Sequence, residues 1–159
     1  MKFNHFDKQG KAIMVDVSSK EPTMRTARAA ATVCLTPITL AAILEGAIQK
    51  GDVLGVARLA GIAAAKRTPD LIPLTHPLAI HCVEVDFKTD VTTGKVVAEA
   101  VVKAFERTGV EMEAMTAATV AALTIYDMCK GSDKSITIEK IALLYKEGGK
   151  SGVYRRKRP

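Results

Sequence analysis

Alternating polar and apolar positions mark three segments of the chain as strands. In residues 25–35 the even positions hold mainly Thr, Arg and Cys and the odd positions mainly Ala, Val and Leu, which favours a strand, with an alanine-rich helix as the rival interpretation. Residues 81–88 and 95–107 alternate on either side of Thr92-Thr93-Gly94 and predict an antiparallel hairpin with a short glycine turn. Weaker alternation predicts two further strands, in residues 11–17 and 134–144.

Helical periodicity fills the region between the first long strand and the hairpin. Apolar residues at positions 40, 43, 44, 47 and 48 follow the i, i+3, i+4 spacing of a helix over residues 38–48. Asp52 is a suitable N-cap for a second helix, which must end near residues 66–67 because Pro69 disfavours helical geometry in the residue before it. Gly55, Gly61 and several alanines give this second helix a smooth face, so we expect it to pack closely against another element.

The strongest helical pattern extends from Glu111 to about Lys130. Thr108 and Glu111 have the spacing of a capping box, in which both side chains satisfy backbone N–H groups at the start of a helix. The centre of this segment carries almost no charge over roughly four turns, so the helix should be buried along most of its circumference. Together these elements predict an α+β fold, with helices on one face of a mainly antiparallel sheet.

Length and composition narrow the class of protein. The 159 residues suit one domain, which we expect to cover residues 1–152 and to be followed by a basic, disordered tail in residues 153–159. No apolar run approaches the roughly 18 residues of a membrane span, and the first residues lack the apolar core of a signal peptide. The odd number of cysteines, three, fits reduced thiols. We therefore expect a cytoplasmic protein without a membrane partner.

The net charge of +6 raises the alternative of a small nucleic-acid-binding module. Four of the positive charges lie in residues 155–158, so the rest of the chain carries only +2. Aromatic residues make up 4% of the chain, Trp is absent, and no basic stripe is interleaved with stacking residues. The sequence therefore predicts no nucleic-acid partner, and the informative cations are those within the body of the chain.

The end of the long predicted helix is the first candidate for chemistry. Asp127 and Lys130 are three residues apart and share one face of the helix. At a partly desolvated position, the carboxylate would orient the lysine, and desolvation would bring the lysine pKa toward neutral, where it can transfer protons. An ordinary ion pair at a helix C-terminus is the alternative.

The start of the same helix holds a second candidate, Glu111 and Glu113. Both suit the first turn of a helix electrostatically, and Glu113 could also accept hydrogen bonds from a guanine-like edge. A third candidate lies on the loop with prolines at 69, 73 and 77, where Lys66, Arg67, Asp70 and His76 suit an anionic ligand. A purely structural histidine is the alternative there.

Three other signals point away from chemistry. His76, His81 and Cys82 match no spacing of a metal site, so we expect no metal. Gly148-Gly149-Lys150-Ser151 ends like a phosphate-binding P-loop but lacks its first glycine and the following helix. Cys129 has no histidine near it in sequence and suits a small buried thiol better than a nucleophile.

Three long strings, residues 50–78, 109–130 and 146–152, closely resemble the cyclic pyranopterin monophosphate synthase family of molybdenum cofactor biosynthesis. The likeness extends from about Met14 to Gly152, and it departs from the family pattern at Thr75, where a cysteine is usual. The resemblance implies a ferredoxin-like α+β fold and a lyase-type rearrangement. Its substrate is 3′,8-cyclo-7,8-dihydroguanosine 5′-triphosphate, and its products are cyclic pyranopterin monophosphate and pyrophosphate.

The resemblance also implies roles for particular residues. The family's catalytic pair falls on Asp127 and Lys130. Its substrate-binding positions fall on nine residues: Arg25, Lys50, Leu74, Thr75, His76, Glu111, Met112, Glu113 and Lys146. No step of the conversion requires redox chemistry or an obligatory bound cofactor, so we expect none; a magnesium ion that accompanies the triphosphate is the open alternative. The implied assembly is a homohexamer, a trimer of dimers, with the sites at the dimer interface.

Overall fold

The computed structural model describes residues 5–157 of the chain. Part of the N-terminal stretch considered above and Arg158 of the basic tail lie outside these residues. Between residues 5 and 157, no helix is both long and apolar enough to cross a membrane.

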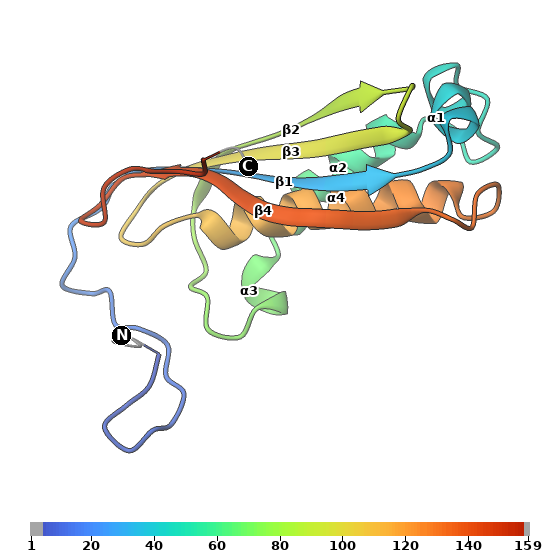
Figure 1. Ribbon diagram of the computed structural model, residues 1–159. Coiled ribbons are helices and arrows are strands. Elements are labelled where there is room, and N and C mark those ends of the chain that lie inside the picture. Colours follow the sequence, from blue (N-terminus) through green and yellow to red (C-terminus); the bar gives the residue numbers. More distant parts are fainter. Residues whose placement is uncertain (1–4, 158–159) are drawn as a thin grey trace.

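Five strands form one antiparallel sheet in the order β2-β3-β1-β4-β5 (Figure 1). Their bounds are β1 Thr23–Cys34, β2 Ile80–Asp90, β3 Lys95–Glu106, β4 Thr137–Glu147 and β5 Tyr154–Arg155. Without the short β5, the chain follows the β-α-β-β-α-β order of a ferredoxin-like domain, with β1 and β3 in the centre. The predicted α+β class is therefore confirmed.

The central strand β1 is the segment whose alanines left a helix as a rival interpretation. Its register with β3 is continuous from Thr23 opposite Glu106 to Cys34 opposite Lys95. Five alternate residues of β1 are buried toward the helices: Arg25, Ala27, Ala29, Ala31 and Val33. A helix would spread these positions around its circumference, whereas a strand puts them all on one face, so the alternation was the decisive signal.

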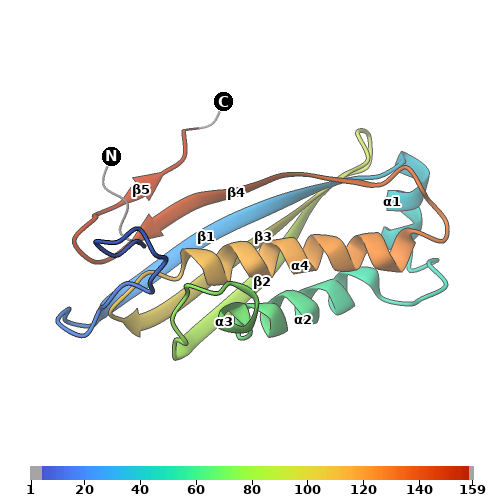
Figure 2. The same cartoon turned by 90° about the horizontal axis from the view of Figure 1, so that it is seen from below.

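The longer helices lie on one face of the sheet, and the first helix lies at the end of β1 (Figure 2). Their bounds are α1 Pro37–Leu44, α2 Val53–Ala65, α3 Thr68–Leu71 and α4 Glu111–Cys129. The predicted N-cap of α2 is confirmed, because the Asp52 carboxylate accepts a hydrogen bond of 2.9 Å from the backbone N–H of Gly55. The long helix α4 extends along most of the sheet, and only Leu123 and Asp127 within it are exposed.

Small side chains allow these layers to approach closely. A Cβ atom on Gly61 of α2 would lie 2.9 Å from the backbone oxygen of Ala117 in α4, so this helix contact requires glycine. The buried surface between α4 and the two central strands consists largely of fully buried alanines: Ala29, Ala31, Ala98, Ala100, Ala114, Ala117, Ala118, Ala121 and Ala122. The close packing expected from the sequence is confirmed.

Several predicted boundaries were wrong. Residues 11–17 form no strand and contribute only an isolated bridge between Ala12 and Phe6, since no strand of the sheet lies beside them. The helix predicted over residues 38–48 ends at Leu44, because Gly46 takes a left-handed φ of 69° and turns the chain. The strand predicted over residues 134–144 begins three residues later, at Thr137, and β4 extends to Glu147.

The predicted capping box was also wrong. Val110 occupies the N-cap position of α4 without a side-chain hydrogen bond, and Glu111 pairs with Lys146 on β4 instead. The ammonium of a neighbouring strand is a stronger partner for the carboxylate than a backbone N–H group. Part of the tail expected to be disordered is a strand, since β5 pairs with Tyr145 and Lys146 of β4.

Candidate active site

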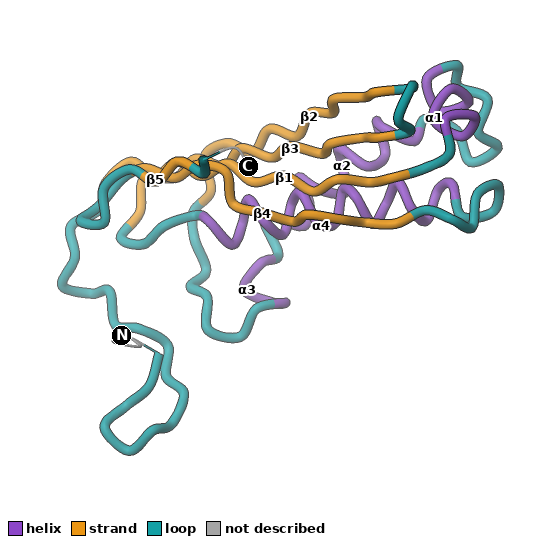
Figure 3. Tube along the Cα trace, viewed as in Figure 1, coloured by secondary structure: helices purple, strands orange, loops and turns teal. Residues whose placement is uncertain are grey.

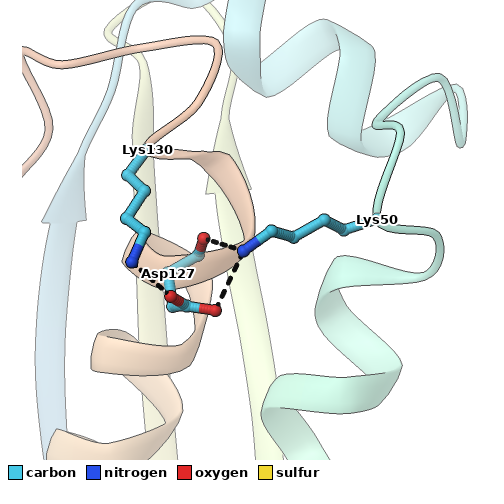
Figure 4. A network of polar contacts seen from close by, with 3 residues as sticks. All are labelled: Lys50, Asp127 and Lys130. Atoms are coloured by element: carbon cyan, nitrogen blue, oxygen red, sulfur yellow. Dashed lines mark hydrogen bonds and ion pairs between the residues drawn. The ribbon is translucent and has the colours of Figure 1, made fainter.

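The C-terminal end of α4 carries a cluster of Lys50, Asp127 and Lys130 (Figure 4). Lys130 Nζ lies 2.7 Å from Asp127 Oδ1. Lys50 Nζ donates to the backbone oxygen of Asp127 at 2.8 Å and to its Oδ2 at 3.1 Å. The predicted pair thus becomes a triad in which one carboxylate accepts from two ammonium groups.

The electrostatics of this cluster correct one expectation. Hydrogen bonds from Lys130, and then from Lys50, lower the pKa of Asp127. The hydrogen bond to Asp127 raises the pKa of Lys130, whereas the sequence interpretation had desolvation lowering it. The side chains of Lys50, Asp127 and Lys130 are 48%, 55% and 53% exposed, so within a single chain there is little desolvation to oppose the ion pair.

Local structure holds the cluster in place from both sides. Gly51, with a φ of 93°, turns the chain directly after Lys50. Beyond Lys130, the buried carboxylate of Asp133 accepts hydrogen bonds from the backbone N–H groups of Thr36 and Ser135, both at 2.9 Å. A hydrogen bond from the Ser135 hydroxyl, at 2.6 Å, and then the backbone bond from Thr36 hold the pKa of Asp133 well below its usual range, and together these bonds fix the loop after α4 against the start of α1. Burial raises the pKa of the Cys129 thiol, which does not favour a nucleophilic role.

The N-terminal end of α4 borders a cavity of about 380 Å³. The loop residues Leu74, Thr75 and His76 line it, together with three residues of the first helical turn: Glu111, Met112 and Glu113. The family resemblance put these six residues among its nine substrate-binding positions, and the structure gathers them around one hollow.

Glu113 is the most unusual titratable group in this cavity. Its side chain is 2% exposed, and burial raises its pKa from the ordinary 4.5 to about 7, with a smaller contribution from the nearby Glu111. Near neutral pH this carboxyl group can therefore either donate or accept a hydrogen bond, which suits a heterocycle that presents both N–H groups and lone pairs.

A second cavity, of about 750 Å³, adjoins the first and shares Lys20, Thr108, Gly109 and Glu111 with it. Cations converge here from separate elements. Two of them, Arg25 on β1 and Lys146 on β4, were predicted from the sequence. Three further ones were not: Lys20, Arg107 and Lys150. Lys146 Nζ lies 2.8 Å from Glu111 Oε1, which links the two cavities.

Arg25 is held rigidly in this second cavity. It is 8% exposed, and its guanidinium donates to the backbone oxygens of Glu106 at 3.0 Å and Arg107 at 3.2 Å. The loop after β4 closes on it at Gly149, where a Cβ atom would lie 1.8 Å from Arg25 Nη1. The double glycine was thus the sequence signal for this wall. The loop is not a P-loop, since the described residues after it, up to 157, form no helix.

The candidate residues therefore form two groups at opposite ends of one helix. Glu113 and Asp127 are separated by 14 residues of α4, or about 21 Å at 1.5 Å per residue. Lys66, Arg67 and Asp70 of the third candidate line neither cavity. Within residues 5–157, no three His, Cys, Asp or Glu side chains gather as metal ligands would.

Comparisons with known proteins identify the family of this chain. The sequence model of the MoaC family matches residues 14–149. The chain belongs to the MoaC family. A relative from Geotalea uraniireducens is 74% identical over 98% of both chains, and one from Geobacter metallireducens is 70% identical over 100% of this chain and 99% of its own. A more distant MoaC relative, from Parvibaculum lavamentivorans, is 56% identical over 98% of both chains, and all three are named cyclic pyranopterin monophosphate synthase.

Proposed function

We propose that this protein is a cyclic pyranopterin monophosphate synthase, a phosphorus–oxygen lyase acting in molybdenum cofactor biosynthesis in the cytoplasm. It converts 3′,8-cyclo-7,8-dihydroguanosine 5′-triphosphate to cyclic pyranopterin monophosphate and pyrophosphate. Membership of the MoaC family and the names of relatives that cover nearly the whole chain support this function.

The proposal rests on one observation: α4 has an ion-paired cluster at its C-terminal end and two ligand-sized cavities at its N-terminal end. One end holds an ion-paired lysine and aspartate, the groups needed to move protons. The other end holds two joined cavities, one with carboxyl groups and a histidine and the other with converging cations. A guanine-derived triphosphate needs both environments, because its heterocycle is recognised by hydrogen bonds and its phosphates by positive charge.

Each group has a chemical task in this proposal. Glu113 contacts the polar edge of the heterocycle, while Arg25 and Lys146 hold the triphosphate and stabilise the departing pyrophosphate. Lys130, oriented by Asp127, transfers protons as the purine-derived ring opens and the pyranopterin forms. Lys50 keeps Asp127 charged and adds positive charge beside the substrate.

A separation of about 21 Å along α4 is too long for one small nucleotide to touch both groups within one chain. We therefore assign each complete site to two chains, with the C-terminal cluster of one subunit facing the cavities of another. Covering by a second subunit would also supply the desolvation of Lys130 that the single chain lacks. A trimer of dimers, the proposed hexamer, satisfies this arrangement.

Direct turnover is the test of the proposed function. The purified protein is incubated with the cyclised nucleotide, and pyrophosphate release and the pyranopterin product are both measured. We expect both products in equal amounts from the wild type and neither from Lys130→Ala. A folded, oligomeric wild-type protein that binds the nucleotide without releasing pyrophosphate would overturn the proposal.

A further inference from the structure

The segment before β1 forms one wall of the smaller cavity. Residues in this segment have no regular secondary structure (Figure 3), yet His5, Val15, Val17 and Lys20 all line the hollow that contains His76 and Glu113. One polar contact joins this wall to the opposite one. The backbone oxygen of Val15 lies 2.9 Å from His76 Nε2.

This contact determines where the histidine carries its proton. A carbonyl oxygen can only accept a hydrogen bond, so Nε2 must be the donor and must carry hydrogen. In the neutral imidazole the lone pair is then on Nδ1. In the imidazolium Nε2 still donates to Val15, so the proton that His76 gains or loses is the one on Nδ1. Within residues 5–157, no group is hydrogen-bonded to that nitrogen.

We infer that Val15 is a positioning residue for His76: its carbonyl holds the imidazole as the Nε2–H tautomer, which leaves Nδ1 as a hydrogen-bond or proton acceptor for a ligand in the cavity. The ligand group is an N–H or O–H of the guanine-derived substrate, and this part of the inference rests on the proposed function. In a proton transfer, the bond between the ligand atom and its hydrogen breaks, an Nδ1–H bond forms, and the resulting imidazolium keeps its bond to Val15.

Both partners of the contact are held by their own surroundings. On the N-terminal side, the Asp16 carboxylate accepts from the backbone N–H of Ser18 at 2.8 Å, and Arg107 donates to the backbone oxygen of Ser18. On the other side, Thr75 Oγ1 donates to the backbone oxygen of Ile72 at 2.8 Å, and Pro77 restricts the chain directly after His76. The two backbones are therefore pre-organised to meet, as a residue that sets a tautomer requires.

Nitrogen-15 NMR of the full-length, ligand-free protein tests the inference. Histidine ring nitrogens with and without hydrogen have well-separated shifts, and the chain has only three histidines, so His76→Gln assigns the signals by difference. For the neutral His76 ring, we expect one signal set, with hydrogen on Nε2 and none on Nδ1. Hydrogen on Nδ1, or an even mixture of the two tautomers, would overturn the inference.

A backbone substitution tests the role of Val15 itself. Replacing Asp16 by the corresponding α-hydroxy acid converts the amide after Val15 to an ester, which weakens the Val15 carbonyl as an acceptor and leaves every side chain intact. The same change at Met14 weakens the Ile13 carbonyl and is the matched control, because within residues 5–157 neither that carbonyl nor the replaced N–H groups make hydrogen bonds.

The two esters should behave differently. The ester at residue 16 should give a tautomer mixture and lower kcat/KM about 3- to 10-fold, as expected for one weakened hydrogen bond, while the ester at residue 14 should match the wild type. An unchanged tautomer in the ester at residue 16 would refute the role of Val15. The NMR readout needs no turnover, so it still tests the tautomer if the proposed function fails. Conversely, a different tautomer would refute the role of Val15 without contradicting turnover of the nucleotide.

Discussion

Lys50 and Asp127, 77 residues apart in sequence, are joined by two hydrogen bonds from one ammonium group, to the backbone oxygen of Asp127 and to its carboxylate. The loop after α1 and the end of α4 are therefore fixed to each other at the proposed proton-transfer group. With Lys130 on the other carboxylate oxygen, the cluster carries two positive charges and one negative charge. Its net charge of +1 suits an anionic substrate.

Removing Lys130 should abolish chemistry without unfolding the protein. We expect Lys130→Ala to lower kcat by at least about 100-fold, the usual effect of losing a proton-transfer group, and to leave the melting temperature unchanged because the side chain is half exposed. Lys134→Ala is the control, since Lys134 is an exposed lysine nearby that makes no ion pair within residues 5–157. Wild-type turnover by Lys130→Ala would remove this residue from the mechanism.

Sites shared between chains predict complementation between inactive variants. Lys130→Ala and His76→Ala should each be inactive alone, because Lys130 belongs to the group at the C-terminal end of α4 and His76 lines the cavity at its N-terminal end. After the two proteins are mixed and their subunits exchange, about a quarter of the sites should combine two intact groups and regain activity. Turnover is measured before and after exchange, with tagged chains to verify mixed oligomers. Mixed oligomers that stay inactive would contradict the shared site.

Gly149 should be far less tolerant of a side chain than Gly152. Both have left-handed φ values, 69° and 65°, so a Cβ atom costs about 1 kcal/mol of backbone strain at either position. At Gly149 the Cβ atom would also displace the Arg25 guanidinium and break its bonds to Glu106 and Arg107, whereas at Gly152 it meets no atom of residues 5–157 within 4 Å. We expect Gly149→Ala to raise KM for the nucleotide about tenfold or more. Similar KM values in the two variants would contradict a role for the Arg25 wall.

The buried Glu113 predicts a pH-dependent difference in stability between the wild type and Glu113→Gln. The folded state raises the pKa of Glu113 from 4.5 to about 7, so it binds a proton more tightly than the unfolded state does. This favourable contribution is fully present below pH 4.5 and is lost as the pH rises through 7. Glu113→Gln lacks this contribution. The free energy of unfolding of the variant, relative to that of the wild type, should therefore rise by on the order of 3 kcal/mol between pH 4 and pH 8.

Urea unfolding at equal protein concentrations measures this difference, because oligomerisation links stability to concentration. Glu106→Gln, at a more exposed carboxylate, is the control and should follow the wild type across the same range. Parallel curves for the wild type and Glu113→Gln would show that the buried carboxyl group is not protonated in the folded state.

The sequence predicted elements well where one pattern dominated. The strict alternation of β3 and the uncharged length of α4 identify both elements and their buried faces, because each is set by the period of its own apolar residues. Residues 11–17 show the limit of this reasoning. Their alternation is that of a strand, but a strand also needs a neighbouring edge, and which edges are free depends on the whole sheet.

The candidate residues were predicted as a set, but their arrangement was not. Asp127 and Glu113 are on one helix, and only the helical rise gives their separation of about 21 Å along its axis, on which the proposed sharing of sites between chains rests. Lys20 and Arg107 escaped notice because isolated surface cations carry no pattern, and the folding of β1 beside β3 brings them to one cavity. The reversed pKa direction of Lys130 was missed for a similar reason, since exposure is a property of the packed chain.

The alanine layer between α4 and the sheet has a consequence for how this protein can vary. Truncating Ala100 or Ala121 removes a single methyl group, but enlarging either one must push a helix away from a sheet, and such overpacking usually costs about 1–3 kcal/mol. In a mutational scan of these alanines, substitutions by larger residues should therefore lower stability more than substitutions by glycine. In a leucine-rich core, by contrast, truncation is the more harmful change. Because α4 has one of the two proposed residue groups at each end, a larger side chain at its middle would, under the proposed sharing of sites between chains, misalign two different sites at once.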